Sequence, residues 1–499
     1  MNLTLDFTSY NFILACGVFV FIYYLIPHKA KWIYLLLASA CIYTLTSPVC
    51  ALFLLATITI TYISGLLIEI SKGKGARTLA MLLPLLFDIA LLVYAKYTGF
   101  LLEIFSEITG SLSEGKAIAV FVPMGVSFYT FQSLAYILDV YKSKIKPEKN
   151  YFKFMLFISY FPQLIQGPIS RFDDLSHELF KEHRFDSKEF AFGAQRVLFG
   201  YFKKLVIADR IGILVTTLTS DTETYHGGWF LVLLIFYTIE LYMDFSGGID
   251  ITIGLSRMLG IKVTENFLRP IFSESVAKFW NRWHVTMGKW FRDYIYIPLG
   301  GSRVKLGKII FNFFVVWLTT GIWHGAGYNY ILWGMMNFAV IASSKLLDKP
   351  YASIRKVLKL DNKKWYRFIC CIRTWLLASL FFTMFAYGSL GNAVNAAKGL
   401  FASGSLKIFT DGSLFTCGLM LRDYIVVGLS ILLVFITECI EEHDAGNKAV
   451  SANDAVLNRI HGLPYICRVL IWLALFIAVI LLGAYGRGYN AASFIYNRF

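Results

Sequence analysis

The sequence has few charged residues for its length. Only 16% of its 499 residues are Asp, Glu, Lys or Arg, whereas a soluble globular protein carries about 25%. Because 57% of the residues are hydrophobic and 17% are aromatic, the chain cannot cover itself with a water-facing surface. This composition excludes a soluble enzyme, a disordered protein and a repeat solenoid, and it indicates a polytopic membrane protein.

Several other signals are missing. The eight cysteines form no Cys-x-x-Cys pair and lie mostly inside apolar runs, so we expect no disulfide framework and no metal site. Residues 1–10 have no basic stretch and no small-residue cleavage site, so we expect no removable signal peptide. No repeat and no long linker divides the sequence, which predicts a single membrane domain over residues 1–499.

Apolar segments long enough to cross a bilayer follow one another along the chain. Some are short or polar enough to be tilted or re-entrant, so we expect an all-α fold with about 11–13 spanning or re-entrant helices. The segments lie at residues 10–26, 32–46, 49–70, 79–102, 118–140, 151–167, 190–208, 228–256, 308–323, 327–346, 367–390, 423–440 and 464–486.

Lys and Arg outnumber Asp and Glu by 47 to 32, and in a membrane protein such an excess marks cytoplasmic loops rather than nucleic-acid binding. Basic residues follow the first, third and fifth segments, whereas Ser47 and Pro48 follow the second and two glutamates follow the fourth. This alternation predicts an extracytoplasmic N-terminus and cytoplasmic loops at 142–149 and 345–364. The three apolar segments after the second loop would each cross the membrane once, which predicts an extracytoplasmic C-terminus. The sequence thus predicts a multi-pass protein of the cell membrane.

Polar groups inside apolar segments are costly, so they indicate where function lies. Residues 161–171 include two prolines, a glycine and two glutamines, which predicts either a broken backbone that lines a cavity or a kinked helix end. Residues 240–250 include three carboxylates, of which Glu240 and Asp244 share a helix face. This second cluster predicts either a polar lumen, lined by Asp244 and Ser246, or a buried network that only holds helices together.

Residues 272–303 combine cationic and aromatic side chains. If the segment is one helix, four cations fall on a single stripe, and such a helix lies at the membrane interface or dips into it. The stripe predicts either contacts to the phosphates of a charged donor or a plain anchor to lipid headgroups. Its members are Lys278, Arg282, Lys289 and Arg292.

His324 follows the apolar segment 308–323. Glycines at positions 321, 325 and 327 surround it, which predicts a backbone open to close approach by a ligand. A neutral imidazole in a low-dielectric interior is a suitable general base for a hydroxyl. The alternative is a packed core histidine, and spacing alone does not separate the two.

Taken together, these motifs resemble the membrane-bound O-acyltransferase family, and more closely its bacterial alginate O-acetylase branch. The most specific part begins with Lys278-Phe-Trp-Asn-Arg-Trp-His284 and continues to Pro298-Leu-Gly-Gly301. The similarity extends over most of the chain, at residues 122–133, 161–171, 201–204, 242–254, 266–301, 323–325 and 494–499.

The resemblance implies a fold with a central polar tunnel and a catalytic region at about 308–346. It implies that His324 is the catalytic histidine and that His284 supports it. The tunnel would be lined by Trp323, Asp244, Ser246 and Asn281.

The function that the resemblance implies is transfer of an acetyl group from cytosolic acetyl-CoA toward an exported polysaccharide. The direct acceptor would be a serine of an extracytoplasmic partner protein, which then acetylates the polymer. One alternative is a D-alanyl transferase that acts on teichoic acid from a carrier-protein thioester. A transporter or flippase without acyl chemistry is the alternative of another class, and the Trp- and Gly-rich surroundings of the two histidines favour an enzyme over it.

Overall fold

The computed structural model describes residues 10–109, 125–361, 363–402, 404–446 and 454–485, and these residues form helices without any β-strand. The start of the predicted segment 118–140, the motif at 494–499 and both chain ends fall outside the described residues. The chain forms two compact units, Met1–Val197 with Thr252–Thr264 and Leu198–Ile251 with Glu265–Phe499. The division falls within two helices, α10 (Ser187–Tyr201) and α12 (Gly228–Met258).

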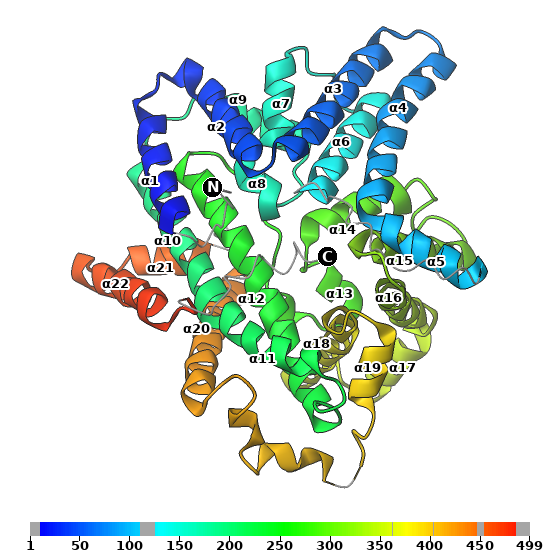
Figure 1. The fold of residues 1–499 in the computed structure, drawn as a ribbon, viewed down its shortest axis with the longest axis vertical. Coiled ribbons are helices and arrows are strands. Elements are labelled where there is room, and N and C mark those ends of the chain that lie inside the picture. The colour runs from blue at the N-terminus through cyan, green and yellow to red at the C-terminus, as the bar shows by residue number, and fades with distance from the viewer. Residues whose placement is uncertain (1–9, 110–124, 362, 403, 447–453, 486–499) are drawn as a thin grey trace. The chain divides into compact units, whose positions relative to one another are not determined.

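The first unit contains the helices drawn from blue to cyan in Figure 1. Besides the start of α10 and the end of α12, its elements are α1 (Tyr10–Leu25), η1 (His28–Ala30), α2 (Lys31–Thr46), α3 (Pro48–Ile70), α4 (Lys74–Leu92), η2 (Val93–Tyr97), α5 (Thr98–Thr109), α6 (Val126–Tyr141), α7 (Tyr151–Ser159), α8 (Phe161–Gln166) and α9 (Phe172–Phe180). Helix α3 packs against α2, α4, α6 and α7, and therefore lies at the centre of the packing in this unit.

Buried polar contacts hold three of these helices together. Asp88 of α4 accepts hydrogen bonds from Thr57 of α3 (3.1 Å) and from Ser133 of α6 (2.7 Å). The Thr61 and Ser133 hydroxyl oxygens are 2.6 Å apart. Because a buried carboxyl group is costly unless it is hydrogen-bonded, these contacts fix the positions of α3, α4 and α6 relative to one another.

The predicted break near residues 161–171 is present. Helix α7 ends at Ser159 and α8 begins at Phe161, with Pro162 in the first turn of α8. Proline is tolerated there because the first backbone N–H groups of a helix have no partner within it. Gln163 is buried, and its Nε2 donates to the Ser170 hydroxyl at 2.6 Å.

The second unit contains the remaining helices. Besides the end of α10 and most of α12, its elements are η3 (Phe202–Ala208), α11 (Asp209–Ser220), η4 (Pro270–Phe272), α13 (Val276–Trp280), α14 (Val285–Phe291), η5 (Arg292–Tyr296), α15 (Leu306–His324), α16 (Tyr328–Leu346), α17 (Asp348–Val357), α18 (Lys364–Ala386), α19 (Leu390–Ala397), η6 (Ser405–Phe409), η7 (Ser413–Phe415), α20 (Leu421–Gly446), α21 (Ala455–His461) and α22 (Tyr465–Leu482). Helix α15 packs along α16, and α16 packs against α18 (Figure 1).

The described helices confirm a multi-pass membrane protein. Seven helical stretches are long and apolar enough to cross a bilayer, and α16 with α17, bent by 62°, would make an eighth. The larger number predicted from the sequence includes shorter helices such as α1, α2 and α6, each of 16 residues. The seven are Pro48–Ile70, Lys74–Thr109, Gly228–Met258, Leu306–His324, Lys364–Ala386, Leu421–Ala445 and Tyr465–Leu482.

Candidate active site

His284 lies in the turn between α13 and α14. Residues 278–292 do not form the one helix that would place the four cations on a single stripe, because α13 ends at Trp280 and α14 begins at Val285. The His284 backbone has φ 47° and ψ 52°, a left-handed conformation that is uncommon for a residue other than glycine. Main-chain hydrogen bonds with residues 266–268 fasten this turn: Leu268 N–H donates to Arg282 O (2.8 Å) and Val285 N–H to Asn266 O (3.0 Å).

The His284 side chain is 1% exposed. Its Nδ1 lies 3.2 Å from the Asn266 side-chain oxygen, and the edge of its ring meets the Phe245 ring of α12, with 4.9 Å between centroids. Burial lowers the pKa of His284 to about 3, because a charged imidazolium is poorly solvated there. The imidazole is therefore neutral at physiological pH.

His324 is the last residue of α15 and is 7% exposed. Aromatic rings from α16 and α18 surround it. The centroid of its ring is 4.8 Å from the Trp333 ring and 5.4 Å from the Phe385 ring. These apolar rings place the imidazole in a low-dielectric environment.

The glycines near His324 serve the packing of α15 against α16. A Cβ atom on Gly321 would lie 2.6 Å from Tyr330 O, and one on Gly334 would lie 2.4 Å from Trp317 O. A Cβ on Gly325 would lie 2.3 Å from the Tyr330 ring. The space beside these glycines, where the sequence predicts that a ligand could approach, is already filled by protein atoms. The glycines allow close contact between α15 and α16 instead.

One tryptophan lies beside both histidines. The Trp323 ring centroid is 4.9 Å from that of His324 and 6.4 Å from that of His284. The structure thus brings the two predicted histidines into one region of the second unit, although 40 positions separate them in the sequence (284 and 324).

An aromatic cluster continues from this region to α13. The Trp280 ring lies 5.2 Å from Trp317 and 5.3 Å from Trp333, and Trp280 Nε1 donates to the Asn337 side-chain oxygen at 2.8 Å. Three neighbours of the histidines are not predicted by the sequence, namely Asn266 and Phe245 beside His284 and Phe385 beside His324. No residue spacing identifies them, because they come from separate elements.

The four cations of the predicted stripe lie in different environments. Lys278 (59% exposed) pairs with Glu274 at 2.6 Å, and Arg292 (56% exposed) pairs with the adjacent Asp293 at 2.7 Å. Lys289 is exposed, and among the described residues it makes no ion pair.

Arg282 is more enclosed than the other three. It donates to Glu442 of α20 at 2.8 Å, and Arg269 donates to the other oxygen of the same carboxylate at 3.0 Å. Arg269 also adopts a left-handed backbone, with φ 53°. Glu442 therefore ties both sides of the His284 turn to α20.

Asp244, one of the two predicted lumen residues of α12, lies in a buried ionic network. Lys204 and Asp244 are each 1% exposed and form an ion pair, and Lys204 also pairs with Asp209 at 2.8 Å. Lys203 pairs with Asp250 at 2.9 Å. These contacts favour the alternative in which the carboxylates of this segment hold helices together.

The other predicted tunnel residues lie in unlike places. Trp323 is buried near both histidines, as described above. Ser246 is buried with no hydrogen-bond partner for its hydroxyl among the described residues. Asn281 is exposed.

Close glycine contacts support the ionic network. A Cβ on Gly200 would lie 2.6 Å from Gly247 O, and a Cβ on Gly247 would lie 2.9 Å from Gly200 O. Only glycines allow the two backbones to approach this closely. The contact brings the segment with Lys203 and Lys204 beside α12.

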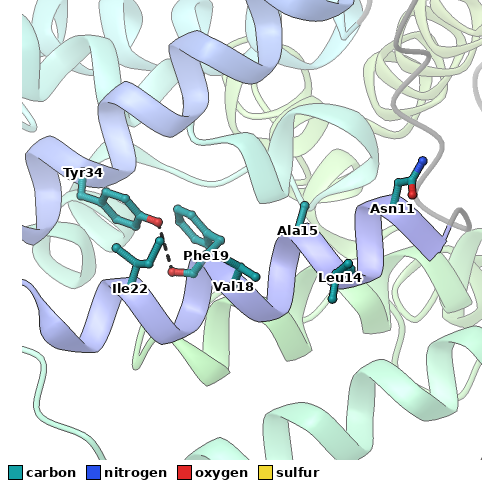
Figure 2. Close-up of a pocket in the computed structure, with 7 residues that line it drawn as sticks. All are labelled: Asn11, Leu14, Ala15, Val18, Phe19, Ile22 and Tyr34. Atoms are coloured by element: carbon teal, nitrogen blue, oxygen red, sulfur yellow. Dashed lines mark hydrogen bonds between the residues drawn. The ribbon is translucent and has the colours of Figure 1, made fainter.

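A pocket in the first unit contains none of the predicted site residues. Figure 2 shows this open pocket beside α1, where the Tyr34 hydroxyl donates to Phe19 O at 3.2 Å. Its lining is mostly apolar and offers no ionisable group for acyl chemistry other than a tyrosine. Within the part of the chain that the structure describes, no group of three or more His, Cys, Asp or Glu side chains is arranged to hold a metal ion.

Comparisons with known proteins place this region in a family. The model of the membrane-bound O-acyltransferase family matches residues 146–390, which include both histidines. The chain is 34% identical over 399 residues to a probable alginate O-acetylase of Pseudomonas aeruginosa, an alignment that covers 78% of this chain and 74% of the relative.

Two further relatives carry other names. Identity is 29% to a peptidoglycan O-acetyltransferase of Helicobacter pylori, over 74% of this chain and 73% of the relative. It is 24% to a teichoic acid D-alanyltransferase of Bacillus subtilis, over 53% of this chain and 68% of the relative.

The chain belongs to the membrane-bound O-acyltransferase family. It is therefore an O-acyltransferase with several membrane-spanning helices, and the alternative of a transporter without acyl chemistry is not supported.

Proposed function

We propose that the chain transfers an acetyl group from cytosolic acetyl-CoA toward hydroxyl groups of an exported polysaccharide. The relatives with the highest identity reported above are named for acetyl transfer to alginate and to peptidoglycan, both of which are polysaccharides. The D-alanyltransferase is less similar and is aligned over a smaller share of this chain. These names favour an acetyl group and a sugar polymer.

The observation that carries the proposal is the grouping of His284 and His324 around Trp323. His324 would act as the general base, because a neutral imidazole can accept the proton of a hydroxyl group. His284, whose ring also lies near Trp323, would support the reaction.

The transfer needs only the donor thioester and an acceptor hydroxyl. His324 would take the hydroxyl proton as the oxygen attacks the thioester carbonyl carbon. The new ester bond forms, the carbon–sulfur bond breaks, and the proton passes from His324 to the departing thiolate of coenzyme A. No metal ion is required by this sequence of steps.

The donor would bind near α13 and α14. Three exposed cations, Lys278, Lys289 and Arg292, belong to this segment, and exposed cations suit the phosphates of acetyl-CoA. We assign Arg282 a different role, because its pairing with Glu442 holds the His284 turn.

We propose that the acetyl group reaches the polymer through a serine of an extracytoplasmic partner protein. Both histidines are nearly inaccessible to water, at 1% and 7% exposure. A single serine side chain on a loop enters such a site more easily than a stiff sugar chain does. The exposed apolar surfaces of the helices would contact lipids of the cell membrane.

The proposed orientation places loops 142–149 and 345–364 in the cytoplasm and both chain ends outside. Cysteines introduced at Lys144 and Lys356, in a chain whose own cysteines are replaced, should react only with a membrane-permeant reagent in intact cells. Reaction of both positions with an impermeant reagent would reverse the orientation.

Labelled donors test the reaction. We expect the purified protein to release coenzyme A from acetyl-CoA and to pass the label to an acceptor hydroxyl, and we expect His324→Gln to do neither. Transfer from a D-alanyl carrier-protein thioester, with acetyl-CoA left intact, would contradict the proposed donor.

A further inference from the structure

Asn266 has no role in the reaction as derived so far, yet it is the main polar contact of the His284 turn. It is 0% exposed. Its backbone carbonyl accepts a hydrogen bond from Val285 N–H at 3.0 Å. Its side-chain oxygen accepts from Thr286 N–H at 3.1 Å and from the Thr286 hydroxyl at 2.9 Å, and it lies 3.2 Å from His284 Nδ1.

The Thr286 backbone fixes the orientation of the Asn266 amide. A backbone N–H can only donate, so the Asn266 atom that faces it must be the oxygen and not the NH₂ group. An amide oxygen has no proton and can only accept. His284 Nδ1, which shares this oxygen, must therefore be the nitrogen that carries a proton.

We propose that Asn266 is a positioning residue that holds neutral His284 as the tautomer with its proton on Nδ1, so that Nε2 carries the lone pair. The consequence for catalysis rests on the proposed function. A proton acceptor at Nε2 is useful only if His284 takes part in acyl transfer.

The local backbone supports this assignment. A histidine in the left-handed region is uncommon, and such residues persist where the surrounding contacts specify them. Here Asn266 accepts hydrogen bonds from both residues that follow His284, through its backbone carbonyl from Val285 and through its side chain from Thr286, so the same residue specifies the turn and the proton position. The ring held in this way borders Trp323, which also borders His324.

Three variants separate proton position from turn stability. Asn266→Ala removes the acceptor for His284. Asn266→Asp keeps an acceptor oxygen and adds a negative charge beside Nδ1. Thr286→Val is the matched control, because it removes one hydrogen bond to the same oxygen but leaves the backbone donor and the His284 contact in place.

The direct test is the ¹⁵N spectrum of the full chain labelled at histidine nitrogens and held in lipid bilayers, with His284→Gln used to assign the signals. We expect a protonated Nδ1 and an unprotonated Nε2 in the wild type and in Thr286→Val. We expect Asn266→Ala to move a measurable share of the proton to Nε2. A proton on Nε2 in the wild type, or an unchanged tautomer in Asn266→Ala, would overturn the proposal.

Kinetics add a readout that a purely structural role would not change. With acetyl-CoA as donor, Asn266→Ala should lower kcat by about tenfold or more with KM unchanged, and Thr286→Val should stay within about threefold of the wild type.

The contacts of the His284 ring described above involve Asn266, Phe245 and Trp323, none of which ionises in the working pH range. A carboxylate at position 266 favours the imidazolium, so Asn266→Asp should lose activity as pH falls and recover it as pH rises.

The outcomes distinguish this inference from the proposed function. If His284→Gln is fully active while the wild-type proton is on Nδ1, the role of His284 in catalysis fails and the tautomer assignment stands. If His284→Gln is inactive but Asn266→Ala leaves the tautomer unchanged, the role of Asn266 fails. If Asn266→Ala does not accumulate, a pH profile of Asn266→Asp identical to that of the wild type would also overturn the inference.

Discussion

The turn around His284 and the helix end at His324 hold their imidazoles by different means. The turn uses hydrogen bonds that Asn266 accepts, a left-handed backbone and two arginines that pair with Glu442. The helix end uses aromatic rings and a close contact between α15 and α16 that only glycines permit. Substitutions near His284 should therefore act through proton position and charge, whereas substitutions near His324 should act through volume.

The largest expected effect is the loss of activity when His324 is replaced, compared with the loss when His284 is replaced. His324→Ala removes the proposed general base, which contributes about 10²–10⁴-fold, so the acetyl content of secreted polymer should fall to near background. His284→Ala should lower it less, because this residue supports the step. Both are measured in cells that lack the native copy, relative to the amount of protein in the membrane. Equal losses would indicate that the two histidines act as a unit.

Substitution of Lys204, in the buried ionic network with Asp209 and Asp244, should cause a large loss of stability. Lys204→Met leaves Asp209 and Asp244 buried without their shared cation, which costs about 3–5 kcal/mol. Phe245, next to Asp244, contacts His284, so activity should fall as well. Lys278→Met breaks an exposed pair and should cost less than about 1 kcal/mol. Equal thermal unfolding of the two variants would argue against the network.

The close contact of Gly334 with Trp317 O predicts a smaller loss of stability near His324. Gly334→Ala places a methyl group against Trp317 O, which should destabilise the chain by about 1–3 kcal/mol and reduce activity through displacement of Trp333. Gly428→Ala in α20 is the matched control, since a Cβ there meets no atom within 4 Å. Thermal unfolding in detergent measures both, and we expect the control to equal the wild type.

The exposed cations predict the smallest effect. Lys278→Gln, Lys289→Gln and Arg292→Gln should each raise KM for acetyl-CoA by about 2–5-fold and leave kcat unchanged. Arg282→Gln should lower kcat instead, because it releases the His284 turn from Glu442. If the first three variants leave KM unchanged, these cations serve only as contacts to lipid headgroups.

Much of the fold could be predicted from the lengths of the apolar runs. The segments predicted at 49–70 and 327–346 are α3 and α16 with ends that differ by at most one residue. Such ends are readable because proline, serine and glycine stand beside them in the sequence, as in the Ser47 cap that precedes Pro48.

The break at His284 could not be predicted, because long-range contacts override the local helical pattern of residues 278–292. Asn266 lies 18 positions upstream of His284, and Glu442 lies 160 positions downstream of Arg282. The sequence also left open whether Asp244 lines a lumen or joins a buried network, because its partner Lys204 is 40 positions away. The roles assigned to the site residues stay predictions, whereas the meeting of both histidines at Trp323 is a feature of the structure.

A double-variant cycle on the purified protein, with His324→Gln, His284→Gln and both together, tests whether the two histidines serve one transfer step. Glutamine keeps hydrogen-bonding capacity but cannot accept a proton at neutral pH. If both histidines serve one transfer step, His324→Gln should abolish transfer of labelled acetyl, and the double variant should be no slower than His324→Gln alone. Near-normal acetyl transfer by a well-expressed His324→Gln variant would contradict the account.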